Sequence, residues 1–335
     1  MTGIPVPPPP GVTEPVPIVT EPVPIVTEPA PVTEPEHPNP QDAEVSARPR
    51  WRDLFARVPR PSRGPSKQRA YELGLRQRVS APVDSTFTIA VVNLKGGVGK
   101  TAVVEALGST FADARDDRVI AVDVDAGDLI DRHGQRNSLR IAELLSQRSV
   151  VRYLDLRAQA HRNSSGLEVL WHADSDRPLE GDDVVQAISL LENRYSVVLV
   201  DCGKELKSSA AEAVLTKSHA LAVVTDTSLN AIRQTRITLD WLADNGYGDL
   251  LRSTILVINH TEQQKPNALA DKELRQLVRH FAAKRVVALP FDPHLREGKE
   301  IVLARLSRQS RHRYLEMAAV LADMFPRSDG ANSTG

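Results

Sequence analysis

The feature that most limits how this chain can fold is an alternation of short apolar runs with helical patterns, which begins at Thr86. The runs are rich in β-branched residues and apolar almost throughout, as expected of strands that are covered on both faces of a sheet. They occupy residues 86–92, 118–124, 167–171, 196–201, 220–225, 253–259 and 285–289. Because helical periodicity separates most of them, they are predicted to form right-handed βαβ units. The pattern therefore predicts a three-layer α/β domain with a mostly parallel sheet.

Composition divides the chain into blocks of opposite charge. The 335 residues carry a net charge of −1, but residues 1–47 hold seven acids and no Lys or Arg, and residues 48–80 hold ten Lys or Arg against two acids. Fourteen of the 24 prolines lie in residues 1–40. A tail of this kind cannot bury enough apolar surface to offset its ordering entropy. We therefore expect a disordered acidic, proline-rich repeat tail (1–47), a basic arm or linker (48–80), one globular domain (81–326) and a disordered C-terminus (327–335).

Several protein classes are excluded by simple absences in the sequence. No apolar run approaches the ~18 residues of a membrane-spanning helix, and the N-terminus lacks the basic start and apolar core of a secretory signal peptide. The single cysteine, Cys202, cannot form an internal disulfide or a multi-thiolate metal or iron–sulfur site. We expect Cys202 to be a small packed residue rather than a nucleophile, and we expect the chain in the cytoplasm.

Two segments ahead of the domain could recruit partners. Residues 12–32 repeat a seven-residue unit, VTEPVPI twice and then VTEPAPV, whose prolines exclude a helix and favour polyproline II. This segment is either a docking strip for a proline-reading partner or a solvated spacer. Residues 50–58, RWRDLFARV, have the pattern of a short basic amphipathic helix. They would bind an anionic membrane surface or an acidic partner, or fold onto their own domain.

The stretch NLKGGVGKT directly after the first apolar run predicts a phosphate-binding loop. Its glycines let the backbone curl so that N–H groups face one anion, and the N-terminus of the following helix adds partial positive charge. Lys100 can reach the β- and γ-phosphates, and the Thr101 hydroxyl can ligate Mg²⁺. Leu94 stands where the full phosphate-loop pattern has its first glycine. The residues expected to bind the nucleotide here are Gly96, Gly97, Val98, Gly99, Lys100, Thr101 and Ala102.

The loop carries a second lysine, Lys95, and the sequence KGGVGKT resembles the deviant Walker A motif of the MinD/ParA group of P-loop ATPases. The resemblance implies a three-layer P-loop NTPase domain, ATP and Mg²⁺ as ligands, and an ATP-dependent homodimer in which Lys95 reaches the partner's phosphates. It implies that Asp125 orients or activates the attacking water and that Asp123 lies near the metal. Asp201, which ends the run VVLVD, is expected to hold Mg²⁺ through water. Lys95, Lys100 and Asp125 are the predicted catalytic residues.

Two later positions resemble the adenine-binding segments of the same family. Asn259 ends the run that resembles the strand whose asparagine reads the adenine edge. Pro290-Phe-Asp292 matches the adenine-flanking turn of the family. The alternative for Asn259, Pro290 and Asp292 is an ordinary strand-end role.

Longer phrases narrow the resemblance further. YELGLRQRV at 71–79 and ALGSTFADARDDRVIAVDVDAG at 106–127, with the proline-rich N-terminus, resemble the EspI-like ATPases associated with actinobacterial type VII (ESX) secretion loci. The resemblance to that family implies an ATPase accessory to secretion. Its expected location is the cytoplasm, with peripheral attachment at the inner face of the membrane as the alternative. Secretion-system components are the partners expected for residues 1–80.

Two other functions stay open. One is a ParA-type DNA- or cargo-partitioning ATPase, for which clustered arginines could supply a non-specific phosphate-binding surface. The other is a nucleotide-gated adaptor with negligible hydrolysis. A solvated helix face is the favoured interpretation of these arginines, and binding to DNA or to a membrane surface is not favoured. The arginines concerned are Arg305, Arg308, Arg311 and Arg313.

Overall fold

The computed structural model describes residues 65–124, 128–134, 139–146, 162–173, 177–203, 205–262 and 267–326. All of them lie in the compact unit Pro49–Gly335. The acidic tail (1–47), the amphipathic segment (50–58) and the C-terminus (327–335) lie outside the described residues.

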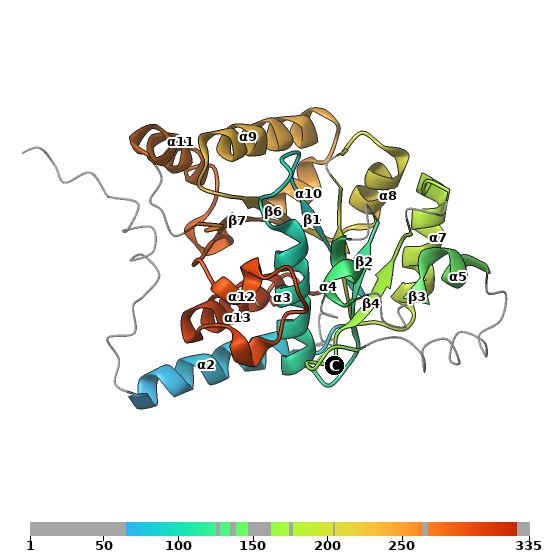
Figure 1. Ribbon diagram of the computed structural model, residues 1–335, viewed down its shortest axis with the longest axis horizontal. Coiled ribbons are helices and arrows are strands. Elements are labelled where there is room, and N and C mark those ends of the chain that lie inside the picture. The colour runs from blue at the N-terminus through green and yellow to red at the C-terminus, as the bar shows by residue number, and fades with distance from the viewer. Residues whose placement is uncertain are drawn as a thin grey trace, which may run out of the picture. The chain divides into compact units, whose positions relative to one another are not determined.

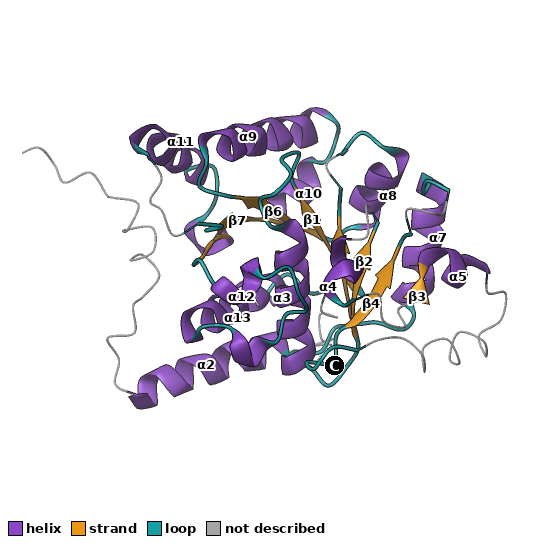
Figure 2. Ribbon diagram, in the orientation of Figure 1, coloured by secondary structure: helices purple, strands orange, loops and turns teal. Residues whose placement is uncertain are grey.

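In the described part of the chain, eight strands form one sheet in the order β3-β4-β2-β5-β1-β6-β7-β8. Figure 2 shows the strands of this sheet in orange, with helices around them. The strands are β1 (Phe87–Val92), β2 (Val119–Asp123), β3 (Leu139–Arg140), β4 (Glu168–Trp171), β5 (Val197–Asp201), β6 (Ala220–Thr225), β7 (Thr254–Asn259) and β8 (Val286–Leu289). Every neighbouring pair in the sheet is parallel. Only β3 was not predicted from the sequence, because two residues are too few to show a period. Since all strands are parallel, their carboxyl ends meet at one edge of the sheet.

Helices connect these strands and cover them. The helices are α2 (Pro65–Val79), α3 (Lys100–Ala114), α4 (Asp128–Arg132), α5 (Ile141–Ser146), α7 (Gly181–Glu192), α8 (Ser209–Lys217), α9 (Leu229–Asp244), α10 (Gly248–Arg252), α11 (Ala268–Val278), α12 (Pro293–Arg296) and α13 (Arg308–Ala322), with 3₁₀ turns η1 (Ala283–Arg285) and η2 (Leu303–Arg305). None of the helices in these described ranges is long and apolar enough to span a membrane.

Both faces of the sheet are buried, and they are buried against different helices. In β1, Ile89 and Val91 pack in the core cluster that contains α3 and α13, whereas Ala90 and Val92 pack in the cluster that contains α7 and α8. Side chains alternate between the two faces of a strand, so this division shows that helices lie on both sides. Figure 1 shows α2, α3 and α13 gathered on one side and α7, α8 and α9 on the other. The predicted three-layer α/β architecture is confirmed.

Helix α2 lies ahead of residue 81, where the sequence interpretation began the globular domain. Leu75 and Val79 are 3% and 0% exposed and belong to the core cluster shared with α13. Arg78 donates to both carboxylate oxygens of Asp323, at 2.9 and 2.6 Å, and to the carbonyl of Ala319. The folded body therefore begins inside the segment that was expected to be a basic arm. The apolar face of α2 was not recognised in the sequence because basic residues are interspersed among its apolar ones.

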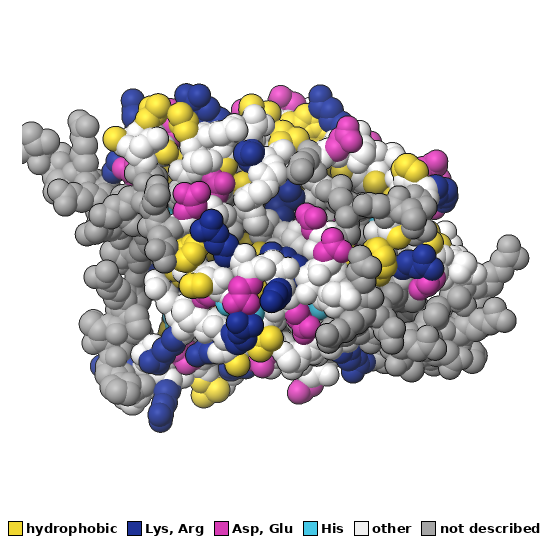
Figure 3. Space-filling model, viewed as in Figure 1, with side chains coloured by type: hydrophobic (Ala, Val, Ile, Leu, Met, Phe, Trp, Pro, Cys, Tyr) yellow, Lys and Arg dark blue, Asp and Glu magenta, His cyan; other side chains and the backbone are white. Residues whose placement is uncertain are grey.

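The four C-terminal arginines do not form one solvated face. Arg308 and Arg311 are exposed, but Arg313 is 9% exposed and pairs with Glu316 at 2.7 Å. Residues two apart on a helix do not share a face, which is why Arg313 points inward while Arg311 does not. The space-filling view shows acidic and basic side chains interspersed on the face it presents, with no large area of one sign (Figure 3).

Candidate nucleotide-binding site

The phosphate loop forms a tight left-handed turn between β1 and α3. Gly97 has φ 80° and Gly99, which caps α3, has φ 89°. Residues with a Cβ rarely adopt such backbone angles, so glycines are needed at these two positions of the loop. Among the described residues no side chain caps the first turn of α3. The N–H groups of that turn therefore face the position where an anion would bind, together with the positive end of the helix dipole.

A buried asparagine fixes the start of the loop. The Asn93 amide nitrogen donates to the Val224 carbonyl at 2.6 Å and to the Thr235 hydroxyl at 2.8 Å, and its oxygen accepts the backbone N–H of Lys95 at 2.8 Å. Asn93 was not singled out from the sequence; the available signal is a polar residue directly after six buried strand residues. These bonds tie the turn that carries Lys95 to β6 and α9. The Lys95 side chain itself is half-buried.

Two buried carboxylates lie side by side at the carboxyl edge of the sheet. Asp123 and Asp201 end β2 and β5, are paired in the register of these strands, and are 1% and 4% exposed. Burial, and secondarily the neighbouring Asp123, raise the pKa of Asp201, while the Thr101 hydroxyl and Lys100 act in the opposite direction. One oxygen of Asp123 accepts the backbone N–H of Leu129 at 2.9 Å. Carboxylates that repel each other in this way are favourable places for a cation.

These residues fit a magnesium ion. Mg²⁺ prefers oxygen ligands and usually keeps several waters, so one or two carboxylates with substrate phosphates are enough to hold it. Asp123, Asp201 and the Thr101 hydroxyl supply such oxygens here. No group of three His, Cys, Asp or Glu side chains able to hold a metal occurs among the described residues. An ion held there would neutralise charge on the phosphates.

The loop and the carboxylates open onto one cleft of about 550 Å³. It brings together most of the predicted phosphate and metal residues and adds others that were not predicted. The lining residues are Gly97, Gly99, Lys100, Thr101, Ala102, Asp123, Asp128, Asp131, Arg132, Asp201, Cys202 and Gly298. Cys202 is 2% exposed overall, as expected for a packed residue. Asp125, the predicted water-orienting residue, lies outside the described residues.

The predicted adenine-contacting residues do not line this cleft, and two of them have structural partners. The Asn259 amide nitrogen donates to the Val98 carbonyl at 2.9 Å and so braces the phosphate loop. Asp292 accepts the N–H groups of His294 at 3.1 Å and Ser307 at 2.8 Å. Burial alone would raise the pKa of Asp292, but its hydrogen bonds outweigh burial and lower it. Pro290 is half-buried. Adenine contacts from these positions stay a prediction.

A second hollow, of about 920 Å³, lies at the amino ends of β7 and β8 and contains none of the motif residues. Its lining includes apolar side chains such as Leu239 and Phe281, and more cations than acids. The cations are Arg236, Arg252, Arg279, Lys284 and Arg285, against Asp240.

Three features define a P-loop nucleotide-binding domain. They are a parallel sheet covered by helices, a glycine-rich loop between the first strand and a helix, and acidic residues at the ends of the adjoining strands. Residues 89–303, more than half of the chain, match the family model described as the CobQ/CobB/MinD/ParA nucleotide binding domain. The chain belongs to this family.

Relatives agree with this assignment. The ESX-1 secretion-associated protein EspI of Mycobacterium tuberculosis (strain H37Rv) is 37% identical over 287 residues, which are 83% of this chain and 42% of EspI. The chain thus spans less than half the length of that relative. A ParA family ATPase from Chlorobium tepidum matches 70% of this chain and 98% of its own, with a TM-score of 0.56 and 19% identity. The septum site-determining protein MinD of Pyrococcus horikoshii, complexed with Mg-ADP, matches 70% and 94%, with a TM-score of 0.54 and 18% identity. Identities this low support the fold alone.

Proposed function

We propose that this chain binds Mg·ATP in the 550 Å³ cleft, hydrolyses it as an ATP-dependent homodimer, and serves as an accessory or regulatory component of a type VII (ESX) secretion system. The observation that carries the nucleotide part is the meeting of the left-handed loop at Gly97 and Gly99 with the paired carboxylates Asp123 and Asp201. In this proposal Lys100 neutralises the β- and γ-phosphates. Thr101 and the two carboxylates hold Mg²⁺.

Hydrolysis and dimerisation would depend on Lys95 and Asp125. Lys95 would reach the partner's phosphates across a dimer, and its backbone is already held in place by Asn93. Asp125 would orient the attacking water. Phosphoryl transfer needs mainly positioning and charge neutralisation, and a lysine that neutralises charge and a carboxylate that positions water would supply both. ATP binding without hydrolysis would favour the nucleotide-gated adaptor instead.

A matched pair of substitutions tests the metal role. Thr101→Ser keeps the hydroxyl, whereas Thr101→Val keeps the shape and removes it. In titrations of Mg²⁺ against a fixed ATP concentration, Thr101→Val should require a higher Mg²⁺ concentration for ATPase activity, and Thr101→Ser should behave as the unsubstituted chain. Equal Mg²⁺ dependence of the two variants would argue against this ligand set.

The secretion part of the proposal is supported by the similarity to EspI. Residues 1–80 contain the acidic repeats and the basic segment, and we assign partner recruitment to residues 1–64, which precede the packed helix α2. The chain would then act in the cytoplasm, or peripherally at the inner face of the membrane. Pull-downs from native cytoplasm with the ATP-bound protein, with and without residues 1–64, test this. Recovery of secretion components only with the full chain is the expected result, whereas recovery of a centromere-binding protein would favour partitioning.

One observation favours a ParA-type DNA-binding function as the second candidate. The 920 Å³ hollow presents five Lys or Arg side chains, among them Lys284 and Arg285. A surface of this charge can bind nucleic acid phosphates without sequence preference, and such binding weakens steeply with salt. Fluorescence anisotropy with duplex DNA at increasing salt tests it. Salt-sensitive binding that is lost in Lys284→Glu/Arg285→Glu would support DNA binding, and no binding at low salt would remove this candidate.

A further inference from the structure

The cleft has a second cation that no motif predicts. Arg132 ends helix α4 and lines the cleft together with Lys100. Its side chain is 14% exposed. Its two polar contacts with other described residues both use the same nitrogen, Nη1, which lies 3.6 Å from Oε2 of Glu105 and 3.4 Å from the Lys299 carbonyl. A guanidinium carries five N–H donors in a fixed fork, so two long contacts at one nitrogen leave most of its hydrogen-bonding capacity unused by the described residues.

Glu105 holds the guanidinium from behind. The Glu105 side chain is fully buried on α3, the helix that starts at the phosphate loop. Its other oxygen, Oε1, accepts the Ile301 N–H at 2.6 Å and lies 3.3 Å from Nε2 of His133. A carboxylate bound from two further segments cannot follow Arg132 if the arginine moves, so it acts as a fixed anchor.

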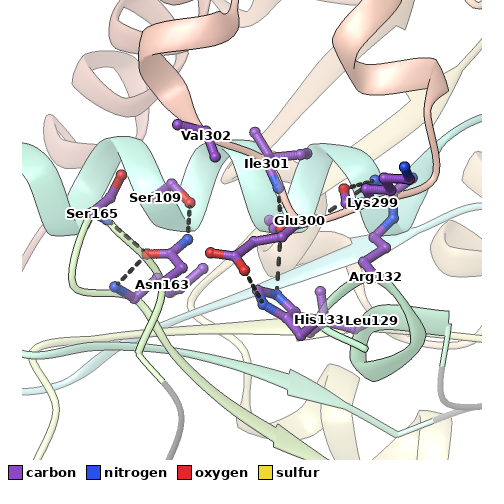
Figure 4. Close-up of polar contacts among 12 residues, drawn as sticks. Ser109, Leu129, Arg132, His133, Asn163, Ser165, Lys299, Glu300, Ile301 and Val302 are labelled. Carbon is purple, nitrogen blue, oxygen red and sulfur yellow. Dashed lines mark hydrogen bonds and ion pairs between the residues drawn. The ribbon is translucent and has the colours of Figure 1, made fainter. Parts of the chain in front are cut away.

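The same cluster joins the segments around the cleft. His133 Nδ1 lies 3.8 Å from the carboxylate of Glu300, and in Figure 4 the Glu300 side chain points toward His133 while Arg132 approaches the backbone at Lys299. The segment 298–302 follows α12, and Gly298 itself lines the cleft. Arg132 is thus held between the phosphate-loop helix and the wall that Gly298 forms.

The charge balance of the cleft gives a physical reason for a cation at position 132. Among the described residues, the cleft is lined by four carboxylates, those of Asp123, Asp128, Asp131 and Asp201, and by two cations, Lys100 and Arg132. A nucleotide polyphosphate adds further negative charge even with Mg²⁺ bound. Arginine matches phosphate oxygens with paired N–H donors, and such charge-assisted bonds are about twice as strong as neutral ones. A second cation on the wall away from the loop would offset the repulsion.

We propose that Arg132 is a phosphate-contacting residue of the nucleotide site and that Glu105 is the positioning residue that presents it. This inference rests on the proposed nucleotide binding and deepens it by naming a contact outside the phosphate loop. Burial raises the pKa of Glu105 to about 7, opposed by the Ile301 N–H and by Arg132, which agrees with a carboxylate whose charge depends on its arginine partner.

Calorimetric titration of Mg·ADP into Arg132→Gln tests the contact. One charge-assisted hydrogen bond corresponds to roughly a tenfold change in affinity, so we expect about a tenfold weaker binding of ADP. The control is Arg177→Gln. Arg177 is an exposed arginine that does not line the cleft and that donates a hydrogen bond of 2.7 Å to Asp183. The Arg177→Gln variant should bind ADP as the unsubstituted chain does. Wild-type ADP affinity in Arg132→Gln would overturn the inference.

Two further variants separate a ligand contact from a structural role. Arg132→Lys keeps the positive charge facing Glu105 but loses the fork, so its unfolding temperature without nucleotide should be unchanged while ADP affinity falls severalfold. Full ADP affinity in Arg132→Lys would overturn the proposal, and this test remains valid even if Arg132→Gln does not fold. Glu105→Gln should weaken ADP binding less than Arg132→Gln does, and should add nothing in the double variant, because it acts through Arg132. An additive loss would contradict the positioning role. If the unsubstituted chain binds no ADP, the proposed function fails, which is a different outcome from equal binding by all variants.

Discussion

The two left-handed glycines of the phosphate loop differ in one respect that can be measured. A Cβ at position 97 would meet no atom within 4 Å, whereas a Cβ at position 99 would lie 2.4 Å from the Asn259 amide nitrogen. The backbone angles are similar, with φ 80° and 89°. Gly97→Ala and Gly99→Ala therefore share the backbone cost and differ in the contact with Asn259.

The magnitudes follow from this difference. A left-handed conformation costs an alanine about 1–2 kcal/mol, which applies to both variants. Gly99→Ala must also displace Asn259, whose bond to the Val98 carbonyl is buried. Leaving such a group unsatisfied costs about 1–3 kcal/mol, so Gly99→Ala should be less stable than Gly97→Ala by about 2 kcal/mol. In a domain of this size that corresponds to a melting temperature roughly 4–8 °C lower.

Urea and thermal unfolding without nucleotide can measure the difference. A third comparison isolates the cause: in the Asn259→Ala background the obstacle is gone, so the extra cost of Gly99→Ala should fall to that of Gly97→Ala. Equal destabilisation by Gly97→Ala and Gly99→Ala in the unsubstituted background would refute the contact, and with it the role of Asn259 as a brace of the loop.

Three further predictions concern catalysis, domain limits and pH. Lys95→Ala and Asp125→Ala should both spare ATP binding and suppress hydrolysis, but in light scattering with ATP only Asp125→Ala should accumulate a dimer; identical monomeric behaviour would contradict the dimer model. Removing residues 1–46 should leave the melting temperature unchanged, whereas a chain starting at Ala81 loses the packed helix α2 and should melt several degrees lower; equal melting would show that α2 does not stabilise the domain. Because the pKa of Glu105 is raised from 4.5 to about 7, the folded chain keeps a proton that the unfolded chain releases between these values, and stability falls as pH rises through them. The total fall in the free energy of unfolding over this range is about 3 kcal/mol. In urea titrations between about pH 5 and 8, Glu105→Gln should remove this dependence of stability on pH; an unchanged dependence would mean that another group causes it.

The strands and the phosphate loop could be predicted because their signals are local. The seven predicted apolar runs agree with the observed strands to within one residue at each end. The loop is a contiguous motif whose glycines have one physical purpose. These features depend on neighbours in the sequence, so no tertiary contact was needed to find them.

The missed features depend on distant partners. Glu105 lies in the middle of an apolar helix pattern and accepts a hydrogen bond from a residue 196 positions later. Arg132 ends a helix of only five residues, too short to show which side faces the cleft. The sequence of helix α2 resembles a basic linker, and only its packing against α13 shows that Leu75 and Val79 belong to the core. Asn93 is a polar residue whose partners, Val224 and Thr235, come from other elements. Tertiary packing gives each of them its role.

Calorimetric titration of Mg·ATP is the most direct test of the proposal that the cleft is a nucleotide site. It should be carried out on the unsubstituted chain, on Lys100→Ala and on Lys272→Ala, which removes an exposed lysine of α11 that does not line the cleft. Since Lys100 is the main counter-charge expected for the β- and γ-phosphates, its loss should abolish binding. The unsubstituted chain and Lys272→Ala should bind ATP with equal affinity. Equal ATP affinity for Lys100→Ala, or no binding by the unsubstituted chain, would contradict the account.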